Sequence, residues 1–176
     1  MAEAPLAARS VREFLDQVAS AEAPVPAGGS VAALSGAGSA ALLALVCSVL
    51  QRHAVEDVAV LRARAESLQG LLLRQVDEDA AAFRAYLDAK HDRALLARVV
   101  DSPLEIARAC QEVVALGNQV DAVASGPVRG DVHAARHIAS AAALAALDLA
   151  EENVGLTADP AAKRQLRERI ARLRQH

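Results

Sequence analysis

Residues 28–50 read GGSVAALSGAGSAALLALVCSVL, and no charged residue lies between Glu22 and Arg52. A helix that is apolar on all sides is typical of the centre of a helical bundle. The alternative is a transmembrane span, for which about 20 apolar residues suffice. Four serines within the segment and the lack of flanking aromatic residues disfavour that alternative, and we expect no membrane contact.

The composition of the whole chain also indicates an all-α protein. The chain has 176 residues, of which 53% are hydrophobic but only 2% aromatic, so alanine and leucine must form most of the core. No run is rich in Val, Ile, Thr and aromatic residues, as strands require. We therefore predict one helical-bundle domain over residues 1–176, with long central helices rich in small residues.

Capping residues followed by apolar helical patterns predict where further helices begin. These predicted starts are Ser10, Ser102-Pro103, Asp131 and Asp159-Pro160. A long helix is also predicted over about 56–88. Its expected inner stripe contains Val60, Leu61, Leu68, Leu72, Val76, Phe83 and Leu87.

Two of the predicted helices, 28–50 and 132–150, are too apolar to face water. A single small bundle hides one central helix easily, but hiding two is harder. We therefore predict a homodimer or a larger even oligomer.

Charge and cysteine content exclude several other classes. The net charge of −3 gives no electrostatic case for nucleic acid. Cys47 and Cys110 lie in apolar helical patterns and predict buried free thiols in a reducing compartment. Because we see no signal-peptide pattern, we expect a cytoplasmic protein. His133 and His137 share a helix face, but no further metal-binding motif accompanies them, so we expect no metal.

Three places carry candidate chemistry. The turn Gly28-Gly29-Ser30 offers backbone N–H groups at a helix start, where carboxylates or phosphates bind, unless it is simply a turn capped by Ser30. Asp79 lies four residues before Phe83, on or near the apolar stripe, whereas Glu78 points away. There Asp79 is either an acid or base of raised pKa or a solvated charge at the edge of the stripe. Asp131 is either a third reactive group or an ordinary N-cap.

Three ordered motifs match a known pattern. The first joins FLDQVAS at 14–20 to PVPAGGSVAAL at 24–34, and the second is DEDAAAFRAY at 77–86. The third begins with PLEIA at 103–107 and leads to a segment whose aspartate falls on Asp131. Together they resemble the formiminotetrahydrofolate cyclodeaminase and methenyltetrahydrofolate cyclohydrolase family.

The resemblance implies an all-α homodimer or larger even assembly that takes a tetrahydrofolate derivative as substrate and uses no other cofactor. Such a protein either expels ammonia from 5-formiminotetrahydrofolate or hydrolyses the 5,10-methenyl ring to the 10-formyl form. We expect the cyclohydrolase, since no formiminotransferase domain accompanies the sequence.

The resemblance also assigns roles to residues. Asp79 and Asp131 become the candidate catalytic carboxylates, which would stabilise the methenyl cation and move protons. The pterin and its glutamate tail would lie near the helix start at residue 28. The candidate substrate-binding residues are Gly28, Gly29, Ser30, Tyr86, Ser125 and His133.

Several positions depart from the family pattern. Ala27 replaces a glycine, residues 125–127 replace Asn-Pro-Asn, His133 replaces a glycine and Leu149 replaces an asparagine. These substitutions support an alternative function: a catalytically inactive homologue that acts as a ligand- or partner-binding helical dimer.

Overall fold

The computed structural model describes every residue except 1–4, 22–24, 54, 56, 90–92 and 176. Within this part of the chain the structure is helical and contains no strand, which confirms the all-α prediction. The elements are, in order, η1 (Leu6–Ala8), α1 (Val11–Val18), α2 (Gly28–Arg52), α3 (Val58–Asp88), α4 (Arg93–Val123), η2 (Gly126–Val128), α5 (Arg129–Val154) and α6 (Pro160–Arg174).

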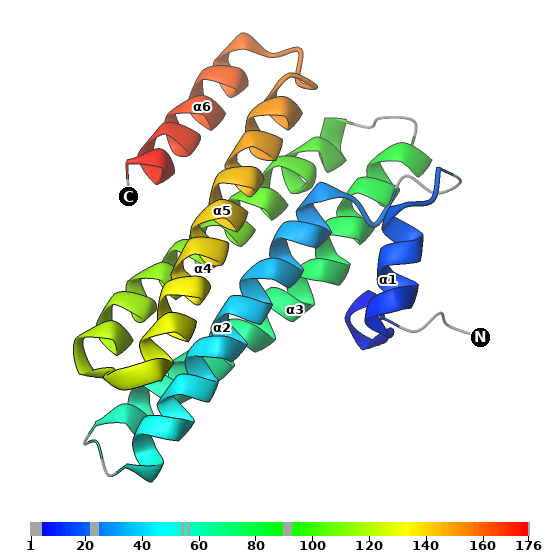
Figure 1. The fold of residues 1–176 in the computed structure, drawn as a ribbon. Helices are drawn as coiled ribbons and strands as arrows, with labels where there is room; N and C mark the ends of the chain where they lie inside the picture. Colours follow the sequence, from blue (N-terminus) through cyan, green and yellow to red (C-terminus); the bar gives the residue numbers. More distant parts are fainter. Residues whose placement is uncertain (1–4, 22–24, 54, 56, 90–92, 176) are drawn as a thin grey trace.

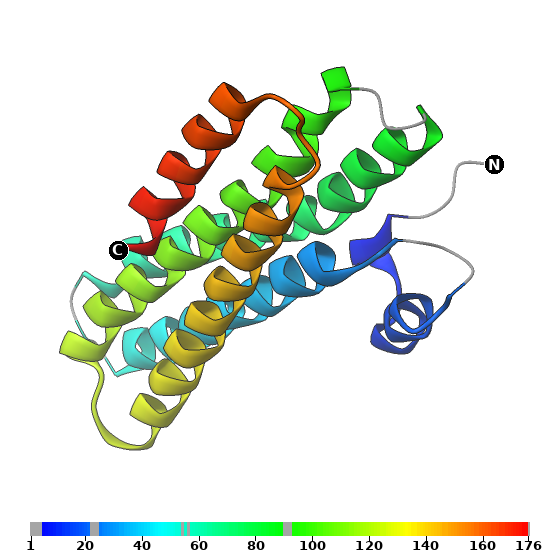
Figure 2. The ribbon, with the colours of Figure 1, turned by 90° about the horizontal axis from the view of Figure 1, so that it is seen from above.

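The four long helices α2 to α5 form an elongated bundle (Figure 1). Helix α2 packs against α3 and α5, and α4 completes the bundle by packing against the same two helices. The short helix α1 lies at the end of the bundle where α2 begins. Helix α6 lies along the outside of α5, on the opposite side of the bundle from α1 (Figure 2).

Small residues let α2 sit at the centre of this packing, as predicted. Ala33, Ala40 and Leu43 are fully buried. Gly36 is needed for the approach of α4, because a Cβ added there would lie 2.5 Å from the Sγ of Cys110. By length and hydropathy α2 could also cross a membrane, yet half of its apolar window is buried inside the bundle, as in a core helix.

The helix starts predicted from the capping residues Ser10 and Asp159 are confirmed. The Ser10 Oγ accepts from the Glu13 N–H, and the Glu13 carboxylate accepts in return from the Ser10 N–H, forming a capping box. Asp159 Oδ1 accepts from the Ala161 N–H over 2.9 Å. The predicted burial of the two free thiols is also confirmed, and burial raises the pKa of Cys110 to about 12.

The predicted helix start at Ser102-Pro103 is wrong, because Pro103 lies inside α4. A proline inside a helix leaves the carbonyl four residues earlier without its N–H donor, here the carbonyl of Val99. The Nδ2 of Asn153 on α5 donates to this oxygen over 2.9 Å. Asn153, a residue of another helix, therefore replaces the backbone hydrogen bond that Pro103 cannot make.

Two further predictions need correction. Asp131 is not a cap, because α5 already begins at Arg129 and Asp131 lies exposed in its first turn. Val60 does not belong to the inner stripe of α3, since it is 73% exposed. The buried face of α3 begins at Val58, and two residues of helix turn Val60 to about the opposite side.

Candidate active site

Asp79 on α3 lies at the end of the bundle where α2 begins. Ser102 Oγ on α4 donates to its Oδ1 over 3.2 Å, and Ser30 Oγ on α2 lies 3.4 Å from its Oδ2. One carboxyl group therefore joins three helices. Its neighbour Glu78 is exposed, as the sequence pattern predicted.

The first turn of α2 passes directly over this carboxyl group. A Cβ added at Gly29 would clash with both carboxyl oxygens of Asp79. The N-cap residue of α2, Ala27, has no side chain that could cap the helix, and the backbone N–H of Ser30 is one of the groups that lower the Asp79 pKa. The sequence analysis predicted that the N–H groups at this helix start bind the carboxylates of a ligand. In the structure the carboxyl group of Asp79 lies there instead.

Burial raises the pKa of Asp79 above that of an ordinary aspartate, and the hydroxyls of Ser102 and Ser30 partly offset this rise. The Ser30 hydroxyl has only one hydrogen, and the carbonyl oxygen of Val76 is its nearer acceptor at 3.0 Å. Because this hydroxyl is shared between Val76 and Asp79, it stabilises the carboxylate only in part. Burial therefore prevails, and Asp79 takes up a proton at a higher pH than an ordinary aspartate, as suits a proton-transfer group.

Asp79 faces a cleft of about 160 Å³. Most of the side chains that line this cleft are apolar. The cleft is lined by Val25, Ala27, Gly28, Gly29, Asp79, Phe83, Val99, Pro103, Leu149 and Asn153. An apolar cleft with a few convergent polar groups and a carboxyl of raised pKa is typical of a binding or catalytic site. Across the described residues, no three His, Cys, Asp or Glu side chains gather as a metal site would need.

Comparison with known proteins identifies the family of the chain. The sequence profile of the formiminotransferase-cyclodeaminase family matches residues 10–172. The chain belongs to this family. A methenyltetrahydrofolate cyclohydrolase from Methylorubrum extorquens is 35% identical over 131 residues, which cover 63% of this chain and 62% of that protein. The match therefore spans less than two thirds of the relative's own length.

A solved structure shows the same fold. The crystal structure of a formiminotetrahydrofolate cyclodeaminase from Thermotoga maritima matches with a TM-score of 0.86 at 18% sequence identity. The match covers 96% of this chain and 89% of the other. At this level of identity the likeness concerns the fold.

The structure separates the site residues predicted for this member of the formiminotransferase-cyclodeaminase family into two groups. Gly28, Gly29 and Asp79 line the cleft. Ser30 is fully buried beside them and contacts Asp79, so its place in the structure is that of a support for the carboxyl group. Tyr86 lies further along α3, where it is buried and its ring centroid is 6.4 Å from that of Phe83.

The second group lies at the other end of the bundle. Ser125 precedes η2, and Asp131 and His133 lie in the first turns of α5, all exposed. Helix α5 extends 22 residues from Asp131 to Asn153, which corresponds to about 33 Å. Within one chain, Asp131 therefore does not reach the cleft of Asp79.

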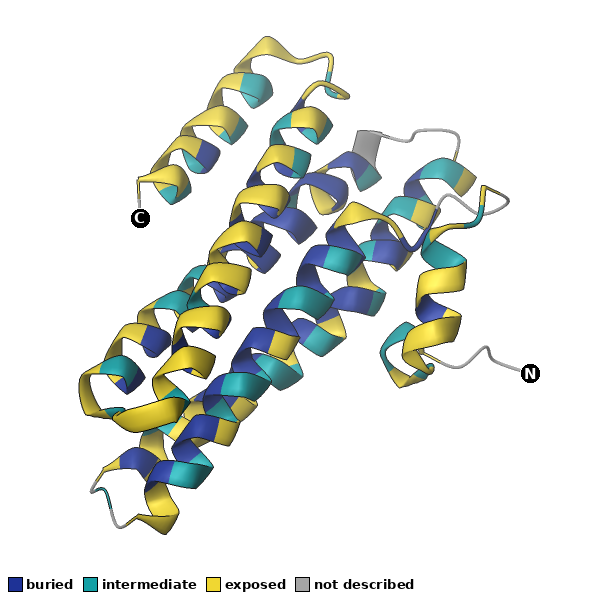
Figure 3. Cartoon of the chain, in the orientation of Figure 1, coloured by how far each residue is buried: buried dark blue, intermediate teal, exposed yellow. Residues whose placement is uncertain are grey.

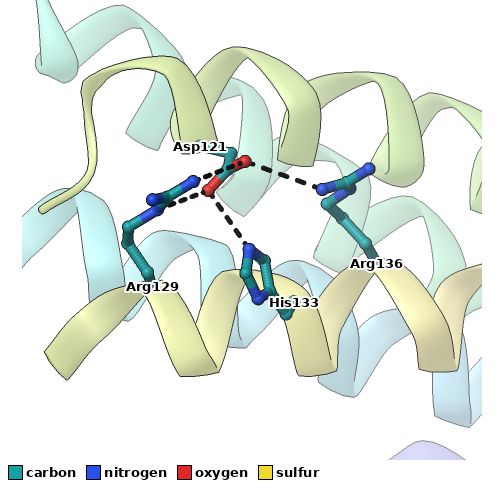
Figure 4. A network of polar contacts seen from close by, with 4 residues as sticks. All are labelled: Asp121, Arg129, His133 and Arg136. Carbon is teal, nitrogen blue, oxygen red and sulfur yellow. Dashed lines mark hydrogen bonds and ion pairs between the residues drawn. The ribbon is translucent and has the colours of Figure 1, made fainter.

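His133 belongs to a surface network around Asp121 (Figure 4). Its Nε2 is 3.4 Å from Asp121 Oδ1, while Arg129 donates to the same carboxylate over 3.0 Å and Arg136 lies 3.7 Å from it. The hydrogen bond from Arg129 is the main reason why the pKa of Asp121 is lowered. This network connects the end of α4 to the start of α5.

Seven of the ten residues that line the cleft were not predicted as site residues, and two of these, Phe83 and Asn153, carry an aromatic ring and a polar amide. Phe83 was assigned only to the core, although it follows Asp79 by one helical turn and therefore shares its face. Asn153 was not considered. It follows Leu149, where the sequence departs from the family pattern, by one helical turn, and that spacing was the available signal.

Proposed function

We propose that this protein hydrolyses 5,10-methenyltetrahydrofolate to 10-formyltetrahydrofolate, with Asp79 as its proton-transfer group and no further cofactor. The observation that carries the proposal is the carboxyl of raised pKa in a mostly apolar cleft. Membership of the family supports a folate substrate. The name of the Methylorubrum relative favours the cyclohydrolase over the cyclodeaminase.

The chemistry of the substrate fits such a carboxyl group. The methenyl carbon belongs to a cationic N–C–N unit, and a bound cation lowers the pKa of a nearby carboxyl and ionises it. Ionised Asp79 then accepts a proton from the water that forms the new C–O bond. Asp79 returns this proton to N5 as the C–N5 bond breaks, and the second water proton passes to solvent.

The direct test is to follow the absorbance of methenyltetrahydrofolate with the purified protein, in parallel with an ammonia assay on 5-formiminotetrahydrofolate. We expect accelerated loss of the methenyl absorbance over buffer alone. Ammonia release instead would identify a cyclodeaminase. Conversion of neither folate would contradict the proposal and favour the inactive homologue, whose folate binding calorimetry would then measure.

We also propose that the protein is a homodimer joined through the outward faces of α2 and α5. Each helix carries an uncharged stripe of exposed or half-buried residues at helical spacing. The stripes are Leu34, Gly38, Ala41 and Leu45 on α2, and Ala134, Ile138, Ala141 and Ala145 on α5. Figure 3 shows the outward side of α5 exposed along its length, next to α2. A second copy would remove both stripes from water.

Light scattering should therefore give about twice the 18.3 kDa mass of the chain. Ile138→Asp is expected to produce a monomer, because it places a charge within the apolar interface. Val60→Asp is the matched control, since Val60 is exposed on α3 outside the proposed face, and this variant should remain dimeric. A monomeric wild-type protein would contradict the proposal.

A dimer would also provide a place for Asp131 in the reaction. Because Asp131 lies about 27 Å along α5 from Leu149, the cleft residue on that helix that is nearest to it, it reaches an active site only in another copy. If it does, Asp79→Asn and Asp131→Asn chains are each inactive alone. Mixing them after subunit exchange should restore about a quarter of the wild-type rate, since half of the dimers then carry one intact site. An active Asp131→Asn homodimer would remove Asp131 from the mechanism.

A further inference from the structure

Pro103 and Asn153 form a pair across the cleft. Pro103 deprives the Val99 carbonyl of its helical donor, and Asn153 Nδ2 supplies that hydrogen bond over 2.9 Å. All three residues line the same cleft as Asp79. The interruption of α4 therefore lies at the site and not elsewhere along the helix.

This contact determines which way the Asn153 amide faces. A carbonyl oxygen only accepts hydrogen bonds, so the NH₂ end of the amide must face Val99 and Oδ1 is held away from it. Within the described part of the chain, the hydrogen bond to Val99 is the one that this amide makes. One N–H and the carbonyl oxygen of the amide therefore remain available in a fixed orientation.

We propose that Asn153 is a substrate-positioning residue whose oriented amide hydrogen-bonds the heterocycle of the ligand in the Asp79 cleft. This inference rests on the proposed function and names the group that holds the folate ring. An amide that offers one donor and one acceptor complements the edge of a pteridine, where an N–H adjoins a C=O. Among the described residues that line the cleft, Asn153 is the neutral polar side chain, since the others are apolar apart from Asp79.

The pair allows an experiment that separates positioning from structural support. In Pro103→Ala, the backbone N–H of residue 103 can bond to the Val99 carbonyl, and Asn153 is no longer needed for that contact. Asn153→Ala should therefore lower the Tm by about 4 °C when Pro103 is present and by little in the Pro103→Ala background. Thermal unfolding of the wild type, both single variants and the double variant measures this coupling.

The kinetic effect should not show the same coupling. Asn153→Ala is expected to raise the KM for methenyltetrahydrofolate about tenfold in both backgrounds, with little change in kcat, because a contact of equal strength in ground and transition states is lost. Asn118→Ala is the matched control. Asn118 is an exposed asparagine on α4 outside the cleft, and its KM should be unchanged.

The outcomes are distinct. An unchanged KM in Asn153→Ala, or a KM that returns to the Pro103→Ala value in the double variant, would overturn the positioning role. The proposed function fails separately, when the wild-type protein itself does not convert the folate. In that case calorimetry with 5-formyltetrahydrofolate decides the role of Asn153: an unaltered Kd in Asn153→Ala, or no binding by the wild type, overturns it.

Discussion

Asp79→Asn is expected to lower the rate of methenyltetrahydrofolate hydrolysis by about a hundredfold or more and, at the same time, to raise the Tm. The rate falls because an amide cannot accept the proton of the attacking water and return it to N5. The Tm rises because burying the ionised Asp79 carboxylate destabilises the folded protein, whereas an asparagine of the same shape carries no charge. Steady-state kinetics and thermal unfolding measure the two effects on the same samples.

The size of the stability effect depends on pH. The pKa of Asp79 is raised in the folded protein, so its contribution to stability is fully present below the unfolded pKa and is lost as the pH rises through the folded pKa. The advantage of Asp79→Asn over the wild type should thus be large at pH 7 and shrink towards pH 4. Other carboxyl groups titrate in both proteins and cancel in this difference. An active Asp79→Asn variant would exclude Asp79 from proton transfer, and a lower Tm at pH 7 would contradict its destabilising burial.

Local sequence signals predicted several parts of the fold because the interactions behind them are local. Ser10 caps a helix through a residue three positions away, and Asp159 through one two positions away. The uncharged run after residue 28 predicted a helix of the bundle core, because a helix without a polar face must pack against other helices. Asp79 could be placed near the apolar stripe because it lies four residues, about one helical turn, before Phe83.

Interactions between distant residues explain what the sequence pattern missed. Ser-Pro is normally a helix start, and nothing near Pro103 indicates that Asn153, on another helix, supplies the missing hydrogen bond. The separation of Asp131 from Asp79 could have been predicted from the sequence. One continuous helix carries Asp131 and Leu149, which places Asp131 about 27 Å from Leu149, and Leu149 lines the Asp79 cleft. The family pattern gave an ordered set of motifs without their distances in space.

Gly29→Ala is expected to show that the cleft depends on a missing side chain. The added Cβ would clash with both carboxyl oxygens of Asp79, so either the carboxyl group or the first turn of α2 must move. Overpacking of this kind costs about 1–3 kcal/mol, or roughly 2–4 °C in Tm for each kcal/mol. The rate of folate hydrolysis should fall about a hundredfold, since a displacement of the proton-transfer group by about 1 Å is enough for that loss.

Two variants make this prediction specific. Gly70→Ala is the matched control, because its Cβ would meet only Arg74 Nη1 at an ordinary 3.7 Å, and helix propensity should leave its Tm unchanged or higher by a few degrees. In the Asp79→Ala background the clash at Gly29 has no partner, so the Tm loss caused by Gly29→Ala should largely disappear. A Gly29→Ala protein with wild-type Tm and activity would mean that Asp79 can leave α2 without cost. The close contact of Asp79 with the start of α2 would then have no part in catalysis.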